Sequence, residues 1–83
     1  MSVEVQWDEF DPATGDKRYV AVDRFARVWR FRVRAGRRQP WREVAPTREM
    51  WAELLDALER RLPRREGVTE ADVAAVRKQA ERA

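Results

Sequence analysis

The chain has 83 residues, 43% of them hydrophobic and 40% charged, and a formal net charge of +3. It contains neither cysteine nor histidine, which excludes disulfide bonds, thiolate and imidazole catalysis and nearly all zinc sites. No apolar run has the length of a membrane span, and the first residues lack the pattern of a signal peptide, so we expect a cytoplasmic protein. The length and the four tryptophans predict one small globular domain over residues 1–83.

Charge is distributed unevenly along the chain. Residues 1–16 contain five acids and no base, whereas residues 17–42 contain ten bases and a single acid, Asp23. A concentrated positive segment attracts phosphate groups and acidic partners. Arginine outnumbers lysine sixteen to two and alanine is abundant, a bacterial-like composition of the kind that GC-rich coding produces. Composition therefore accounts for part of the arginine content.

The first predicted elements form a hairpin. Residues 2–10 alternate apolar Val3, Val5 and Trp7 with polar residues, the pattern of a half-buried antiparallel strand. Residues 11–16 combine proline, glycine and two aspartates, which favours a hairpin loop.

The returning strand, residues 17–25, carries apolar side chains on both faces. One face has Val20 and Val22, and the other has Tyr19, Ala21 and Phe25. Such a strand is either central with both faces covered or covered on one face by a partner chain. The segment 23–26 is compatible with a tight turn or with a bulge in one long bent strand.

Residues 28–34 are predicted to form the central amphipathic strand. Apolar Trp29, Phe31 and Val33 alternate with a stripe of arginines on the opposite face, namely Arg30, Arg32 and Arg34. Residues 35–40 form a second hairpin turn, in which Gly36 is available for a positive φ and Arg37 and Arg38 lie at the tip. A short fourth strand over residues 41–44 would complete a sheet spanning residues 2–44.

Two helices are predicted after the sheet, over residues 47–62 and 69–81. In the first, Thr47 is a candidate N-cap, Pro63 ends the helix, and one face carries Trp51, Leu54, Leu55, Leu58 and Leu62. In the second, Thr69 is a candidate N-cap with Asp72 in the capping-box position. The chain is therefore predicted to be an α+β protein, a small antiparallel meander of three to four strands followed by two helices packed on one face.

Two roles are predicted for the large polar and aromatic side chains of the sheet. Glu4 and Asp8 on the first strand are expected to pair with the arginine stripe across the sheet. Core packing is expected for Trp7, Trp29 and Trp51, whereas Trp41, beside Pro40, is expected outside as an interface anchor.

Catalysis is not predicted. Ser2 is the only serine, the three glycines are isolated, and no carboxylate pair has a dry pocket, so we expect no enzyme and no catalytic, cofactor or metal site.

The predicted function is binding or assembly with a protein partner, most simply a second copy in a homodimer. The alternative is a nucleic-acid-binding domain that uses the arginine stripe and the 35–40 turn. At the level of architecture alone, a three-stranded sheet with a helix behind it resembles integrase amino-terminal domains that contact DNA through a sheet. Under both hypotheses the candidate binding residues are Arg30, Arg32, Arg34, Arg37, Arg38, Trp41 and Arg42.

Overall fold

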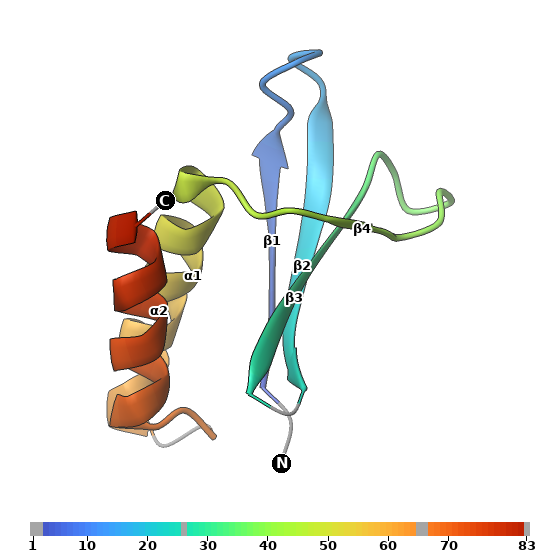
Figure 1. Ribbon diagram of the computed structural model, residues 1–83. Helices are drawn as coiled ribbons and strands as arrows, with labels where there is room; N and C mark the ends of the chain where they lie inside the picture. The colour runs from blue at the N-terminus through green and yellow to red at the C-terminus, as the bar shows by residue number, and fades with distance from the viewer. Residues whose placement is uncertain (1–2, 26, 65–66, 83) are drawn as a thin grey trace. The chain divides into compact units, whose positions relative to one another are not determined.

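A computed structural model describes residues 3–25, 27–64 and 67–82 (Figure 1). It contains one antiparallel sheet with strand order β1-β2-β3-β4, followed by two helices joined by a 3-10 turn. This confirms the predicted α+β order, with all four strands present. The elements are β1 Glu4–Phe10, β2 Lys17–Phe25, β3 Val28–Arg34, β4 Arg42–Val44, α1 Arg48–Arg61, η1 Leu62–Arg64 and α2 Glu70–Arg82.

The chain divides between Ala45 and Pro46 into two compact units, the sheet and the helices. The first strand begins at Glu4 rather than at residue 2, which lies outside the described residues. No helix in the described ranges has both the length and the apolar character needed to cross a membrane.

The loop between β1 and β2 is held by Asp11. Its side chain accepts a hydrogen bond from the backbone N–H of Ala13 at 2.8 Å, and its backbone carbonyl accepts one from Gly15 at 2.7 Å. Gly15 has a φ of 77°, a conformation that glycine adopts without steric cost. The predicted hairpin loop is confirmed.

The connection between β2 and β3 is a tight turn, which decides between the two alternatives for residues 23–26. β2 pairs with β3 as far as Phe25 opposite Val28, so only two residues separate the strands. Arg27 adopts a φ of 66°, in the left-handed region that tight hairpin turns require. Ala26 lies outside the described residues.

The turn between β3 and β4 differs from expectation. The backbone N–H of Gln39 donates to the carbonyl of Gly36 at 3.0 Å, so Gly36 is the first residue of the turn and Arg37 and Arg38 occupy its centre. Gly36 does not have a positive φ, and that prediction is wrong. The first position of a common turn makes no such demand on the backbone.

Helix α1 begins at the predicted cap. The Thr47 hydroxyl accepts a hydrogen bond from the Met50 N–H at 3.2 Å. In return, the Met50 sulfur accepts a hydrogen bond from the Thr47 N–H at 3.5 Å. The buried residues of this helix are Met50, Leu54 and Leu58. The predicted apolar face is therefore rotated: Met50 takes the buried position, and the half-buried side chains are Trp51, Leu55 and Leu62.

Helix α2 has the predicted capping box. The Thr69 N–H donates to Asp72 Oδ2 at 3.0 Å, and the Asp72 N–H donates to the Thr69 hydroxyl at 3.2 Å. The two helices pack against each other, and Arg77 of α2 lies 3.4 Å from a carboxylate oxygen of Glu59 on α1. The helical unit thus has a cap at the start of each helix and an ion pair, Arg77 with Glu59, between its helices.

Candidate functional site on the arginine face of the sheet

Strand alternation gives the sheet two chemically different faces. The buried face carries Val5, Val20, Val22, Phe31 and Val33. We call the opposite surface the arginine face; it comprises Glu4, Gln6, Asp8, Phe10, Lys17, Tyr19, Ala21, Asp23, Phe25, Val28, Arg30, Arg32, Arg34 and Glu43, together with Trp41, whose ring contacts Arg34. Ala21 of β2 faces this side and is covered within its own chain, since it is only 1% exposed.

Asp23 on β2 is the acid that pairs with the arginine stripe. Its Oδ2 lies 2.6 Å from Nη2 of Arg30, and its Oδ1 lies 3.6 Å from Nη2 of Arg32. The predicted pairing of Asp8 with these arginines is wrong, since Asp8 pairs with Lys17, and β2 lies between β1 and β3. Strands are about 4.8 Å apart, so acids on β1 are nearly 10 Å from β3.

Acids on β1 instead find partners on β1 and β2. Asp8 lies 2.9 Å from the Lys17 ammonium, and Glu4 accepts a hydrogen bond from the Gln6 amide at 2.6 Å. The hydrogen bond and the charge of Lys17 lower the pKa of Asp8 below its ordinary value. Reciprocally, the hydrogen bond to Asp8 raises the pKa of Lys17, and the charge of Arg37 opposes that rise.

Aromatic rings lie against the arginine stripe. The guanidinium carbon of Arg34 is 4.4 Å from the ring centre of Trp41 and 5.7 Å from that of Tyr19. The guanidinium carbon of Arg30 is 5.5 Å from the ring centre of Phe25. A guanidinium group stacked on a ring still presents its in-plane N–H groups to acceptors.

The hydrogen bonds of Arg34 are only partly satisfied. Its Nη1 donates to the backbone carbonyl of Arg37 at 3.3 Å, whereas its buried Nε has no acceptor in the part of the chain that the structure describes. A buried donor without an acceptor costs about 1–3 kcal/mol, and because this Nε is buried, only the terminal nitrogens of Arg34 are available to a carboxylate or a phosphate from outside.

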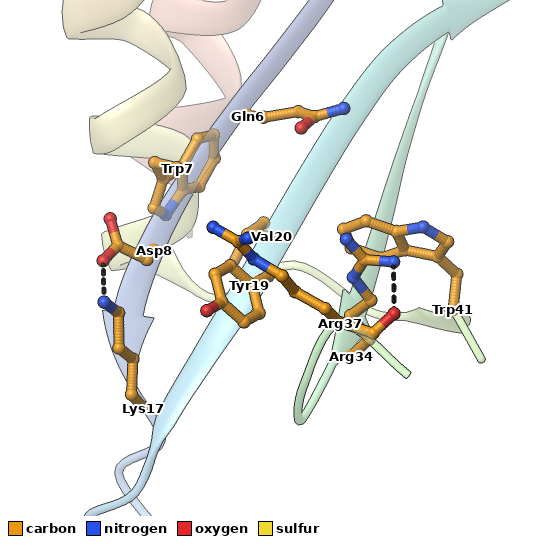
Figure 2. Close-up of a pocket in the computed structure, with 9 residues that line it drawn as sticks. All are labelled: Gln6, Trp7, Asp8, Lys17, Tyr19, Val20, Arg34, Arg37 and Trp41. Carbon is orange, nitrogen blue, oxygen red and sulfur yellow. Dashed lines mark hydrogen bonds and ion pairs between the residues drawn. The ribbon is translucent and has the colours of Figure 1, made fainter. Parts of the chain in front are cut away.

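An open pocket of about 350 Å³ lies at this end of the arginine face (Figure 2). Figure 2 shows the Asp8–Lys17 ion pair on one side and Arg34 with Trp41 on the other. The side chains that give the pocket its chemistry are Asp8, Lys17, Tyr19, Arg34, Arg37 and Trp41. Aromatic walls and three cations beside one acid make it suited to an acidic group next to an apolar one.

Three large hydrophobic side chains are conspicuously exposed, and all belong to the arginine face. Phe10 is 74% exposed, Phe25 68% and Val28 60%. Phe25 and Val28 are cross-strand partners beside the β2–β3 turn, and Phe10 ends β1 near the pocket. Apolar side chains therefore flank the arginine stripe at both ends of the face.

The structure brings together only part of the predicted binding set. Arg30, Arg32, Arg34 and Trp41 share the arginine face, and Arg37 lines its pocket. Arg38 is exposed in the turn beside them. Arg42 is separate, because it pairs with Val33 and so lies on the opposite face of the sheet.

Sequence reasoning missed two residues that shape the site, Tyr19 and Asp23. Both had a signal in the sequence, since Tyr19 alternates with Ala21 in β2 and Asp23 is the only acid among ten bases. Their position between the arginine strand and β1 became evident only from the strand order.

The tryptophans are less buried than predicted. Trp7, Trp29 and Trp51, expected in the core, are half-buried, and so is Trp41. The indole N–H of Trp7 donates to Glu9 at 3.0 Å, which keeps that ring near the surface. The expectation that three tryptophans pack inside is therefore wrong, and valines, Phe31, Met50 and leucines form the core instead.

Comparison with protein-family models, with curated proteins and with solved structures finds no match to this chain.

Proposed function

We propose that this chain is a small non-enzymatic intracellular module that binds protein through its arginine face, with self-association as its principal form. The observation that carries the proposal is the exposure of Phe10 at one end of the arginine face and of Phe25 and Val28 at the other. Removing exposed apolar surface from water is the main driving force of protein association. Aromatic and arginine side chains, which predominate in interface hot spots, occupy the same face.

The charge balance of the arginine face favours a protein partner over a polyanion. The strands contribute four bases to it, Lys17, Arg30, Arg32 and Arg34, and four acids, Glu4, Asp8, Asp23 and Glu43. A nucleic acid laid across this face would meet as many carboxylates as cations. A protein surface with its own pattern of both signs can match it.

Sedimentation velocity over about 5–500 µM protein tests the proposal, since interfaces of this kind range from weak to tight. We expect a concentration-dependent dimer that is weakened by Phe25→Ser and Val28→Ser. Ala71→Ser, an exposed substitution on α2, is the matched control and should leave association unchanged. A chain that stays monomeric over the whole range would refute self-association.

A second candidate function, nucleic-acid binding, is favoured by the turn between β3 and β4. Arg37 and Arg38 occupy its centre, and no acidic side chain in the described residues forms an ion pair with either. Fluorescence anisotropy with labelled single-stranded and duplex oligonucleotides at low and moderate salt tests this candidate. Nucleic-acid binding requires that the affinity for these oligonucleotides falls steeply as salt rises. It also requires that the affinity is lost in the double variant Arg37→Gln, Arg38→Gln.

A further inference from the structure

The charges of the arginine face lie at matching heights along β1 and β3, the two neighbours of β2. Asp8 pairs with Tyr19, and Tyr19 pairs with Arg34, so these three residues form one row across β1, β2 and β3. The next row on this face has Ala21 at its centre. The row after that consists of Glu4 on β1, Asp23 on β2 and Arg30 on β3. In these two rows β1 therefore presents a carboxylate at the level where β3 presents a guanidinium group.

We propose that two copies of this chain pack arginine face to arginine face, related by a two-fold axis parallel to the strands. This inference rests on the proposed function and specifies its partner and geometry. Rotation about that axis, when it runs along β2, places β1 of one copy over β3 of the other and preserves height along the strands. It sets the partner's Asp8 over Arg34 and, by symmetry, Asp8 over the partner's Arg34.

The charge pattern selects this axis over the perpendicular one. A two-fold axis perpendicular to the strands, in the plane between the sheets, would place β3 of one chain over β3 of the other. The arginines of the two chains would then face each other. Like charges at such a contact cost several kcal/mol and exclude that arrangement. Aligned packing of two sheets about 10 Å apart is an ordinary geometry for sheet faces.

The centre of the face fits this packing. Ala21 on β2 lies on the axis and carries no charge, and because it is only 1% exposed the partner meets the side chains around it rather than Ala21 itself. Asp23 also lies beside the axis, but its charge is balanced within its own chain by Arg30 and Arg32. The two copies therefore meet at their middle strands without an unpaired charge.

The pocket provides the acceptor site for the partner. The Arg34 guanidinium carbon lies 4.4 Å from the centre of the Trp41 ring, and its Nε is buried, so the terminal nitrogens rather than Nε are the donors that remain for a carboxylate. The partner's Asp8 supplies that carboxylate. Phe10, two residues beyond Asp8 on β1 and 74% exposed, is carried with it toward the aromatic walls of the pocket.

The size of the face predicts a weak dimer. The three overlapping strands of about seven residues, at about 3.3 Å per residue and about 4.8 Å apart, bury on the order of 700 Å² over two copies. This lies at the low end of specific interfaces, where association is transient. Charge matching rather than area then decides which partner is accepted.

A charge exchange tests the arrangement in the full-length chain. Asp8→Arg and Arg34→Asp, each alone, are expected to weaken the dimer at least about tenfold, because each sets like charges against each other at both symmetric contacts. Mixing the two variants in equal amounts is expected to restore association, since Arg at position 8 of one copy then meets Asp at position 34 of the other, while Arg34 of the first meets Asp8 of the second. Sedimentation velocity reports the dimer, and circular dichroism confirms that each variant is folded.

Arg42→Asp makes the same change of charge on the opposite face of the sheet and is the matched control, expected to leave the dimer intact. A wild-type dimer that Asp8→Arg weakens no more than Arg42→Asp does would overturn this arrangement and leave self-association standing. If Arg34→Asp does not fold, Asp8→Arg measured against Arg42→Asp decides. A wild-type chain that forms no dimer refutes the proposed function itself, and salt-sensitive oligonucleotide binding would then assign the face to nucleic acid.

Discussion

The guanidinium carbon of Arg34 lies 4.4 Å from the centre of the Trp41 ring, which joins the last residue of β3 to the residue that precedes β4. β4 itself has only three residues and pairs with β3 over Phe31, Arg32 and Val33. So short an edge strand has few backbone hydrogen bonds of its own. The stacked pair therefore fastens the β3–β4 end of the sheet and shapes the pocket there.

Replacing Trp41 by alanine is expected to destabilise the protein by about 1–2 kcal/mol, because a half-buried ring and its cation–π contacts with Arg34 and Arg32 are lost. Trp41→Phe keeps an aromatic face and should lose less than half of that amount. Urea denaturation followed by circular dichroism measures both. Equal stability of Trp41→Ala and the wild type would show that the stacking does not fasten this end of the sheet.

Asp23→Asn removes the carboxylate charge while keeping the side-chain volume, and we expect it to cost about 1–3 kcal/mol. The Asp23 side chain is only 15% exposed and serves two arginines, whose pairing also raises the pKa of Arg30. Asp56→Asn is the matched control: it breaks an ion pair with Arg60 at an exposed site on α1, which is worth about 0.5 kcal/mol or less.

A double-mutant cycle of Asp23→Asn with Arg30→Gln should show coupling, because the two groups are 2.6 Å apart. Strictly additive effects in urea denaturation would mean that the ion pair contributes nothing to stability.

The Asp8–Lys17 pair predicts a defined pH response. The pKa of Asp8 is lowered, so its stabilising contribution is present above the ordinary aspartate pKa of 3.8 and is lost as pH falls through the lower folded value. The pKa of Lys17 is raised, so its contribution is complete below 10.5 and is lost as pH rises through the higher folded value. Between these limits the contribution of the Asp8–Lys17 pair to stability does not change with pH.

Carboxyl-detected NMR titration measures the pKa of Asp8 directly. In Lys17→Met we expect the pKa of Asp8 to return toward its ordinary value, since the hydrogen bond and the attraction that lower it are removed. Arg42→Met, which removes a cation from the opposite face, should leave that pKa unchanged. An Asp8 pKa insensitive to Lys17→Met would contradict the ion pair.

Arg27→Gly is expected to stabilise the chain by up to about 1 kcal/mol, because an L-residue with a positive φ bears a steric penalty that glycine does not. Arg27→Val should be destabilising, since a β-branched side chain fits this conformation worst. Thermal unfolding of the two variants gives the order of stability. The reverse order would contradict the left-handed turn between β2 and β3.

Local sequence patterns alone predicted the order of strands and helices. The alternation in residues 28–34, the loop at 11–16 and the caps at Thr47 and Thr69 each depend on a few neighbouring residues, whose backbone preferences act without the rest of the chain. For the same reason the alternation correctly separated the arginine stripe from the apolar face of β3. The turn chemistry at Gly36 is the exception, because several turn types satisfy that short segment.

Tertiary structure decided which of those side chains meet. Placing β2 between β1 and β3 paired the arginines with Asp23 instead of with Glu4 and Asp8, and the alternation of β4 turned Arg42 away from Trp41. Packing also rotated the buried face of α1 to Met50 and left the tryptophans half exposed. These outcomes depend on distances between strands and on competition for buried volume, which no single stretch of sequence contains.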